Sequence, residues 1–178
     1  SFTFNLVHYV EQFCEDVTVR RNNQITLVEV EAFDAIILSP GPGLPKDAGI
    51  MPELIKEFAP SKKILGVCLG HQAIGEAFGC TLKNLDVVHH GVAIPINVLD
   101  SGDPLFDGVP SRFDTGRYHS WVIDQDAKNS ELAITASDDE GEVMAIRHKS
   151  FNICGVQFHP ESLLTEHGLI LIENWVNS

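Results

Sequence analysis

The segment around Cys68 constrains the fold of this chain more than any other part of the sequence. An apolar run of strand length, Ile64–Val67, passes through Gly66-Val67-Cys68-Leu69-Gly70 into a stretch with helical spacing that ends at Gly79. Gly-x-Cys-x-Gly between a strand and a helix is the thiol counterpart of the Gly-x-Ser-x-Gly nucleophile elbow, where side chains at the flanking positions would collide. The segment therefore predicts a strand, a sharp turn that presents the Cys68 thiol, and a helix.

Strand-like and helical segments alternate along the first half of the chain, and strand-like segments dominate the second half. The expected strands are Val17–Val19, Ala35–Leu38, Ile64–Val67, Val92–Val98, Leu132–Ala136, Val143–Arg147 and Ile153–Phe158. The expected helices lie near Phe4–Glu11 and at Met51–Phe58, His71–Phe78 and Gly168–Val176. This order predicts an α/β fold: a doubly wound, mostly parallel central sheet with a flavodoxin-like core and added antiparallel strands.

The length of 178 residues predicts one domain, residues 1–178, because a domain has about 150 residues and no repeat or linker interrupts the chain. The chain begins with Ser1 and enters a helix almost directly, so a doubly wound sheet would lack its usual first strand. We therefore expect that strand, and the true N-terminus, to precede Ser1.

The charge balance argues against two classes of partner. With 12 Lys plus Arg against 25 Asp plus Glu, the formal net charge is −13, which repels nucleic acid and anionic membrane surfaces. No apolar run reaches the roughly 18 residues that span a bilayer, and no signal peptide is evident, so we expect a cytoplasmic protein. Four scattered cysteines without a Cys-x-x-Cys pair predict neither a disulfide framework nor a metal site, and no cofactor is expected.

Cys68 is the candidate nucleophile. A thiol at a helix N-terminus faces the positive end of the helix dipole, which favours the thiolate, and the amide of Leu69 is a natural donor to an oxyanion. The alternative is that Cys68 is only a small buried apolar residue.

A Pro/Gly loop follows the neighbouring strand, Ala35–Leu38. Because proline has no N–H, the free donors in Gly41-Pro42-Gly43 are the two glycine amides. Loops at the carboxyl ends of neighbouring parallel strands face a common crevice, so this loop can supply a second oxyanion donor. The alternative is a stiff turn without a chemical role.

His159 and Glu161 supply a candidate base and its partner. Side chains two apart on extended backbone point the same way, so Glu161 can accept the ring N–H of His159 and leave the other nitrogen for a thiol. Alternatively, both residues are surface or capping groups. His119 is the rival base, but no carboxylate lies two residues from it, which favours His159.

Four segments, taken in order, resemble the class I (triad) glutamine amidotransferases. They are Ser39–Gly43, Gly66–Gln72, Arg117–Trp121 and Gly155–Ser162. Within that family the chain is similar, from Ser1 to about Val176, to the glutaminase subunits of anthranilate synthase (component II) and of 4-amino-4-deoxychorismate synthase.

The resemblance implies that Cys68 forms a γ-glutamyl thioester with L-glutamine, with His159 as acid/base and Glu161 as its orienting partner. It also implies a substrate-binding set of Gly41, Pro42, Gly43, Leu69, Gln72, Ser120 and Trp121. The family often has Leu at the position of Trp121, which a backbone contact would tolerate. Val92 stands where the family commonly has Lys or Glu, so no site is carried over from that loop.

The same resemblance implies a partner, because one domain of this size has no room for a second active site that uses ammonia. The expected partner is the large chorismate-binding synthase subunit, with anthranilate as the leading product and aminodeoxychorismate as the alternative. Further alternatives are a stand-alone γ-glutamyl hydrolase and a non-catalytic binding subunit. The intact Cys68, His159 and Glu161 argue against the second of these.

Overall fold

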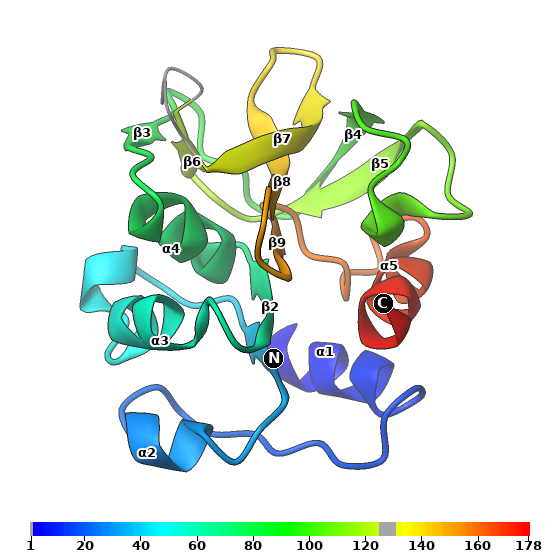
Figure 1. The fold of residues 1–178 in the computed structure, drawn as a ribbon. Coiled ribbons are helices and arrows are strands. Elements are labelled where there is room, and N and C mark those ends of the chain that lie inside the picture. The colour runs from blue at the N-terminus through cyan, green and yellow to red at the C-terminus, as the bar shows by residue number, and fades with distance from the viewer. Residues whose placement is uncertain (1, 125–130) are drawn as a thin grey trace.

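The computed structural model describes residues 2–124 and 131–178, and its centre is a curled sheet of seven strands. The strand order is β1-β2-β9-β8-β7-β4-β5 (Figure 1). Three neighbouring strands, β1 (Ala35–Leu38), β2 (Lys63–Val67) and β9 (Ile153–Val156), are parallel. The α/β fold class expected from the sequence is confirmed.

Helices cover both faces of this parallel part. α3 (Met51–Phe58) and α4 (Leu69–Ala77) lie on one face, and α1 (Phe2–Val10) and α5 (Gly168–Asn177) lie on the other (Figure 1). In α3 the buried residues Met51, Leu54, Ile55 and Phe58 recur with helical spacing, which gives the helix one apolar face.

The core is divided by the sheet because successive strand residues point to opposite faces. Ile64 and Ile153 pack against α3 and α4, whereas Leu65 and Cys154 pack against α1 and α5. All four side chains are almost fully buried. Burial on both faces fixes the register of β2 beside β9, which positions the turn that follows β2.

The remaining strands of the large sheet are antiparallel. They are β4 (Val92–Val98), β5 (Arg112–Arg117), β7 (Leu132–Asp138) and β8 (Val143–His148). A second, two-stranded sheet pairs β3 (Leu82–Asn84) with β6 (Trp121–Ile123). Short helices complete the described part: α2 (Leu27–Val30), η1 (Pro45–Asp47) and η2 (Pro104–Phe106).

One expected strand is wrong: Val17–Val19 belongs to no strand. These residues alternate Val-Thr-Val as a strand would, but they pair with no neighbouring strand, and Val19 is 51% exposed. The sequence prediction also omitted β3, β5 and β6. β5 mixes Arg, Asp and Thr with one Phe, and its two arginines form ion pairs with Asp139 and Asp138.

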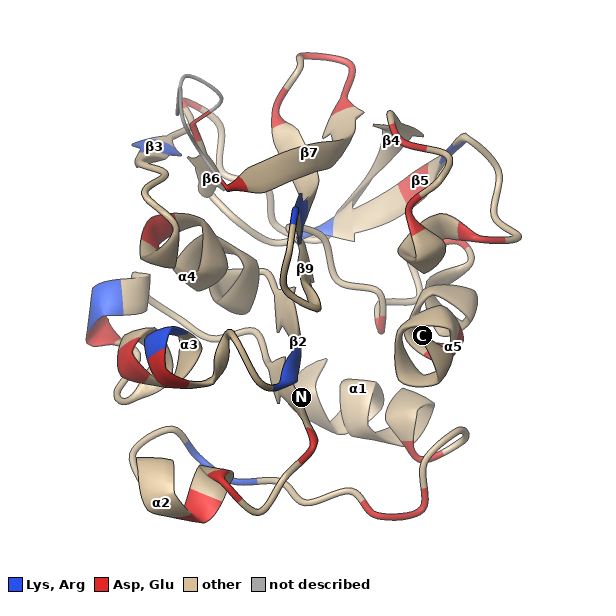
Figure 2. Cartoon of the chain, viewed as in Figure 1, with Lys and Arg blue, Asp and Glu red and all other residues tan. Residues whose placement is uncertain are grey.

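Basic residues are fewer than acidic ones, and both kinds are spread over several elements (Figure 2). Across residues 2–124 and 131–178, no helix has the length and apolarity needed to cross a bilayer. In the same residues, no cluster of three or more His, Cys, Asp or Glu side chains has the arrangement of a metal site.

Candidate active site

Cys68 occupies a strained turn between β2 and α4. Its φ is 52° and its ψ is −99°, a combination that L residues rarely adopt. The Cys68 amide donates to the Val156 carbonyl at 2.9 Å, which holds the turn beside the end of β9.

Two glycines make this turn possible. A Cβ on Gly66 would lie 2.5 Å from the Gly70 carbonyl oxygen, and a Cβ on Gly70 would lie 2.2 Å from the Leu38 carbonyl oxygen. Both distances are well inside van der Waals contact with backbone atoms that cannot move aside. The Gly-x-Cys-x-Gly pattern is therefore required by close approach of α4 to β1 and β2.

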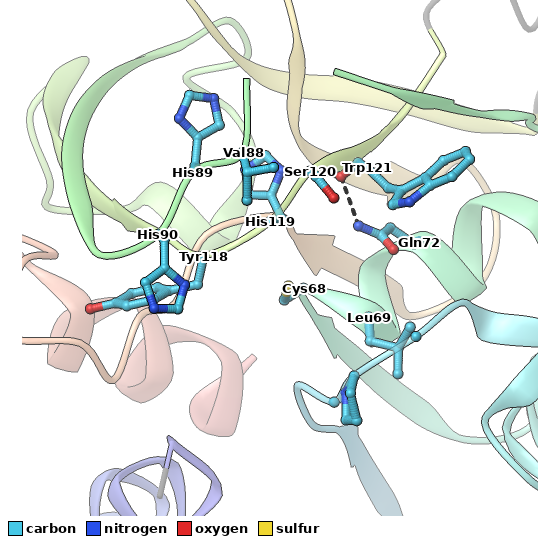
Figure 3. A pocket seen from close by; sticks show the side chains of 13 residues that line it. Cys68, Leu69, Gln72, Val88, His89, His90, Tyr118, His119, Ser120 and Trp121 are labelled. Carbon is cyan, nitrogen blue, oxygen red and sulfur yellow. Dashed lines mark hydrogen bonds between the residues drawn. The ribbon is translucent and has the colours of Figure 1, made fainter. Parts of the chain in front are cut away.

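A cavity of about 200 Å³ opens beside Cys68 (Figure 3). All seven residues expected to bind substrate line it: Gly41, Pro42, Gly43, Leu69, Gln72, Ser120 and Trp121. Val88, His89, His90, Tyr118 and His119 complete its wall. The cavity thus joins the loop after β1, the turn after β2 and the segment between β5 and β6.

The Gly41–Gly43 loop lies directly over the start of α4. A Cβ on Gly41 would lie 3.1 Å from Leu69 Cδ2, and Gly43 has a φ of +81°, where glycine is strongly preferred. The loop and the first amide of α4 therefore border the same side of the cavity, where both can face a developing negative charge.

His159 and Glu161 form a buried pair just beyond β9. His159 Nδ1 lies 2.8 Å from Glu161 Oε1, and the two residues are 2% and 1% exposed. The bond fixes the tautomer, because a carboxylate can only accept: Nδ1 carries the hydrogen and Nε2 is free to take a proton.

Burial raises the pKa of Cys68 to about 12, and the charge of Glu161 acts in the same direction. The Leu69 amide and the Gln157 side chain oppose the rise by hydrogen bonding. The Leu69 amide at the helix N-terminus thus favours the thiolate, as expected from the sequence, but burial has the larger effect. Desolvation outweighs the N-terminal amides, so the thiol is protonated until a base removes its proton.

His119, the rival base, has a different environment. Its Nδ1 lies 3.1 Å from the Trp121 carbonyl oxygen, and burial lowers the pKa of its ring to about 3. A ring that holds a proton so weakly is a poor general base at neutral pH. It is also committed to a backbone carbonyl, whereas the ring of His159 is paired with a carboxylate.

Two residues near the site were missed by sequence reasoning. Gln157 is fully buried and donates through Nε2 to Cys68 Sγ at 3.6 Å. Phe2 packs its ring against His159, with centroids 4.5 Å apart, and against Tyr118, at 4.6 Å. Gln157 could have been noticed as a polar residue inside an apolar strand, but nothing in the sequence placed Phe2 near His159.

Comparison with known proteins gives one family over the whole chain. Residues 1–178 match the family described as glutamine amidotransferase class-I. This match covers every segment that lines the cavity.

Curated relatives match the chain at similar levels of identity. The anthranilate synthase component 2 of Lactococcus lactis is 48% identical over 99% of this chain and 89% of its own length. The aminodeoxychorismate/anthranilate synthase component 2 of Bacillus subtilis is 41% identical over 100% of this chain and 92% of its own length. The bifunctional protein TrpGD of Thermotoga maritima is 43% identical over 99% of this chain, which spans 30% of that longer protein.

A solved structure shares the fold. The structure of a Thermoplasma acidophilum protein, described as one subunit of a GMP synthase, superposes with a TM-score of 0.87 over 99% of this chain and 87% of its own. Its sequence identity is 24%, so this likeness concerns the fold alone.

Proposed function

The chain belongs to the class I glutamine amidotransferase family, and on this premise we propose that it is a glutaminase subunit that supplies ammonia to a synthase. The observation that carries the proposal is the position of Cys68, at a strained turn that opens into a cavity. The ring of Tyr118, which lines this cavity, packs against His159 of the buried His159–Glu161 pair, with centroids 4.9 Å apart. The proposed domain is the whole of residues 1–178, and the proposed substrate is L-glutamine.

The first half-reaction begins with proton transfer from the Cys68 thiol to Nε2 of His159. The thiolate attacks the side-chain amide carbon of glutamine, and the carbonyl electrons move onto oxygen to give a tetrahedral intermediate. The amides of Leu69 and of a glycine in the Gly41–Gly43 loop are the proposed donors to this oxyanion. His159 returns its proton to the amide nitrogen, ammonia leaves, and a γ-glutamyl thioester remains.

The second half-reaction hydrolyses the thioester. His159 takes a proton from water, hydroxide adds to the thioester carbon, and the carbon–sulfur bond breaks to release glutamate. The proton then returns to the Cys68 sulfur, so the site ends as it began. Glu161 holds the imidazolium that forms in both halves, since its carboxylate is buried against Nδ1 at 2.8 Å.

The protonated resting thiol makes the base indispensable in this scheme. Because burial raises the pKa of Cys68 to about 12, almost no thiolate exists at neutral pH without a base. A protonated thiol also protects the enzyme from reacting before its substrate is bound.

A synthase partner is proposed on two supports. The Lactococcus lactis and Bacillus subtilis relatives are each named as component 2 of a synthase. In addition, exposed apolar side chains lie near the cavity. Val88 lines the cavity and is 67% exposed, and Phe2 packs on His159 and is 37% exposed. Leu163 is 99% exposed and follows Ser162, whose hydroxyl contacts that of Tyr118. Exposed apolar groups beside a cavity are typical of a protein interface.

The proposed partner subunit binds chorismate, and the leading product is anthranilate. The alternative product is aminodeoxychorismate, which the name of the Bacillus subtilis relative supports as a second activity.

All four cysteines are free, which fits the proposed cytoplasmic location, where thiols stay reduced.

The proposal is tested with the complex of this chain and its synthase subunit. Cys68→Ser should abolish product formation from glutamine and leave formation from added ammonium salts unchanged. Cys14→Ser, a half-buried thiol outside the cavity, is the matched control and should leave both rates unchanged. Equal loss of both activities in Cys68→Ser would contradict the role of ammonia donor, and the isolated product decides between anthranilate and aminodeoxychorismate.

A further inference from the structure

Two buried side-chain amides connect a backbone carbonyl to the Cys68 sulfur. Gln72 Nε2 donates to the Trp121 carbonyl oxygen at 2.9 Å (Figure 3). The same Nε2 donates to Gln157 Oε1 at 3.1 Å. Gln157 Nε2 in turn donates to Cys68 Sγ at 3.6 Å. Gln72 is 3% exposed and Gln157 is fully buried, so water does not compete for these bonds.

The Trp121 carbonyl sets the direction of the whole chain of bonds. A carbonyl oxygen can only accept, so the NH₂ end of Gln72 must face it, and the second hydrogen of that NH₂ meets the oxygen of Gln157. With its oxygen so engaged, Gln157 must turn its own NH₂ toward the sulfur. Reversal of either amide would oppose two donors or two acceptors inside the protein, which is costly where no water can compensate.

We propose that Gln157 is a positioning residue that directs a hydrogen-bond donor at the sulfur of Cys68, and that Gln72 and the Trp121 carbonyl fix its orientation. The inference rests on the proposed function in taking Cys68 as the nucleophile. A sulfur that accepts an N–H hydrogen bond is stabilised as the thiolate more than as the thiol. This chain of bonds from the Trp121 carbonyl through Gln72 and Gln157 to Cys68, here called the relay, therefore favours ionisation of the thiol when the base acts.

The surroundings of the sulfur explain why such a donor matters. Burial and the charge of Glu161 both raise the pKa of Cys68, and the Leu69 amide and Gln157 lower it. His71, packed against Gly155 on β9, is fully buried and its pKa is lowered to about 3, so it contributes no positive charge at neutral pH. Within the described residues, two hydrogen bonds lower the pKa of Cys68, one from the Leu69 backbone and one from the Gln157 side chain. Gln157 is therefore the one side chain that lowers this pKa by a hydrogen bond.

The relay also divides the atoms of Gln72 between two tasks. Its Nε2 is fully committed to Trp121 and Gln157, which leaves Oε1 as the group that can face a substrate in the cavity. Gln72 thus borders the substrate cavity and orients the amide that contacts the nucleophile.

The test measures ionisation of Cys68 in the isolated chain, independently of glutamine. In a Cys14→Ser background, the rate of alkylation of Cys68 by iodoacetamide is followed by mass spectrometry between pH 7 and pH 10. Below the titration midpoint, a rise of one pKa unit lowers this rate about tenfold. The rate of the fully buried Cys154 is recorded in the same samples, since loosening of the fold would expose it.

The variants separate hydrogen bonding from packing. Gln157→Met keeps the length of the side chain and removes the donor, so the Cys68 rate should fall about tenfold. Gln157→Glu should lower it further, because a carboxylate would then face the sulfur. Gln72→Glu should also lower it, because Gln157 would turn its NH₂ toward the new carboxylate. Gln24→Met, at an exposed position, is the control and should match the parent.

An unchanged alkylation rate of Cys68 in folded Gln157→Met and Gln157→Glu would overturn the proposed role of Gln157. A rise in the alkylation rate of Cys154 in the same variants would also overturn it, because it would indicate that Gln157 acts through packing. If neither Gln157 variant folds, Gln72→Glu decides by the same measurement. Glutamine hydrolysis is assayed separately. If the variants change the Cys68 alkylation rate as expected but the parent protein hydrolyses no glutamine, the proposed function is contradicted and the proposed role of Gln157 is not.

Discussion

Nδ1 of His159 lies 2.8 Å from Oε1 of Glu161, and both residues are almost fully buried. Within the described part of the chain, the second carboxylate oxygen of Glu161 has no hydrogen-bond partner, so this carboxylate serves the imidazole alone. In the proposed mechanism the pair therefore acts as one unit that accepts a proton at Nε2 and stabilises the resulting charge.

Replacing that charge should cost activity rather than structure. In Glu161→Gln the amide oxygen can still accept from Nδ1, but the imidazolium loses its negative partner, so kcat for glutamine hydrolysis should fall at least about 100-fold. Steady-state hydrolysis measures the loss, and thermal unfolding checks that the fold is retained. The ammonia-dependent rate of the complex is the control. A Glu161→Gln protein with near-normal kcat would mean that Glu161 only fills space.

The turn at Cys68 should tolerate no side chain at Gly70. A Cβ there would lie 2.2 Å from the Leu38 carbonyl oxygen, so Gly70→Ala must push α4 away from β1. We expect a loss of about 3 kcal/mol or more in the free energy of unfolding, together with loss of glutamine hydrolysis. Gly102→Ala is the control, since its Cβ would meet only the Asp100 carboxylate at 3.2 Å. Chemical denaturation of both variants measures the difference, and equal stability would refute the steric argument.

The parts of the structure that sequence reasoning reached are those whose signal lies within a few consecutive residues. Apolar runs located β1, β2, β4, β7, β8 and β9, and the glycines around Cys68 predicted the turn because their role is steric and local. His159 and Glu161 were expected to pair because extended backbone places residues two apart on the same side. Each of these features can be predicted from a few consecutive residues, without information about the rest of the chain.

The parts that were missed depend on contacts between distant segments. Gln157 meets Cys68 across a separation of 89 residues, and Phe2 reaches His159 only because α1 packs beside α5. The raised pKa of Cys68 was missed for the same reason: the helix N-terminus, which lowers that pKa, is visible in the sequence, whereas the burial that outweighs it belongs to the folded protein.

A buried ion pair holds the strand that leads into the cavity wall. Arg117, at the end of β5, lies with its Nη2 2.5 Å from Asp138 Oδ2, and their side chains are 1% and 6% exposed. Arg117→Met would leave Asp138 buried without its cation, so we expect a loss of about 3–5 kcal/mol in the free energy of unfolding. Urea denaturation measures this loss.

The exposed pair of Arg112 and Asp139 is the matched control for Arg117. Its side chains are 49% and 58% exposed, so Arg112→Met should cost less than about 1 kcal/mol. In the double variant Arg117→Met/Asp138→Asn, both charges are removed and stability should partly return. No recovery in the double variant would mean that the loss comes from packing rather than from an uncompensated charge.

Two buried histidines should make the fold sensitive to mild acid. Burial lowers the pKa of both His71 and His119 to about 3, whereas an unfolded chain binds the proton near pH 6.5. Between these values the unfolded state holds protons that the folded state does not, so stability is greatest above about pH 6.5 and falls as the pH decreases toward 3. From pH 7 to pH 5, each histidine should lower the free energy of unfolding by about 2 kcal/mol.

Urea denaturation at pH 7, 6 and 5 measures this dependence. His71→Gln and His119→Gln cannot take up a proton in this range, so each should make the fall in stability smaller than in the parent protein, whatever its stability at pH 7. His8→Gln is the control, because the His8 side chain is 63% exposed. If the two buried variants lose as much stability between pH 7 and pH 5 as the parent, the acid sensitivity arises from the carboxylates instead.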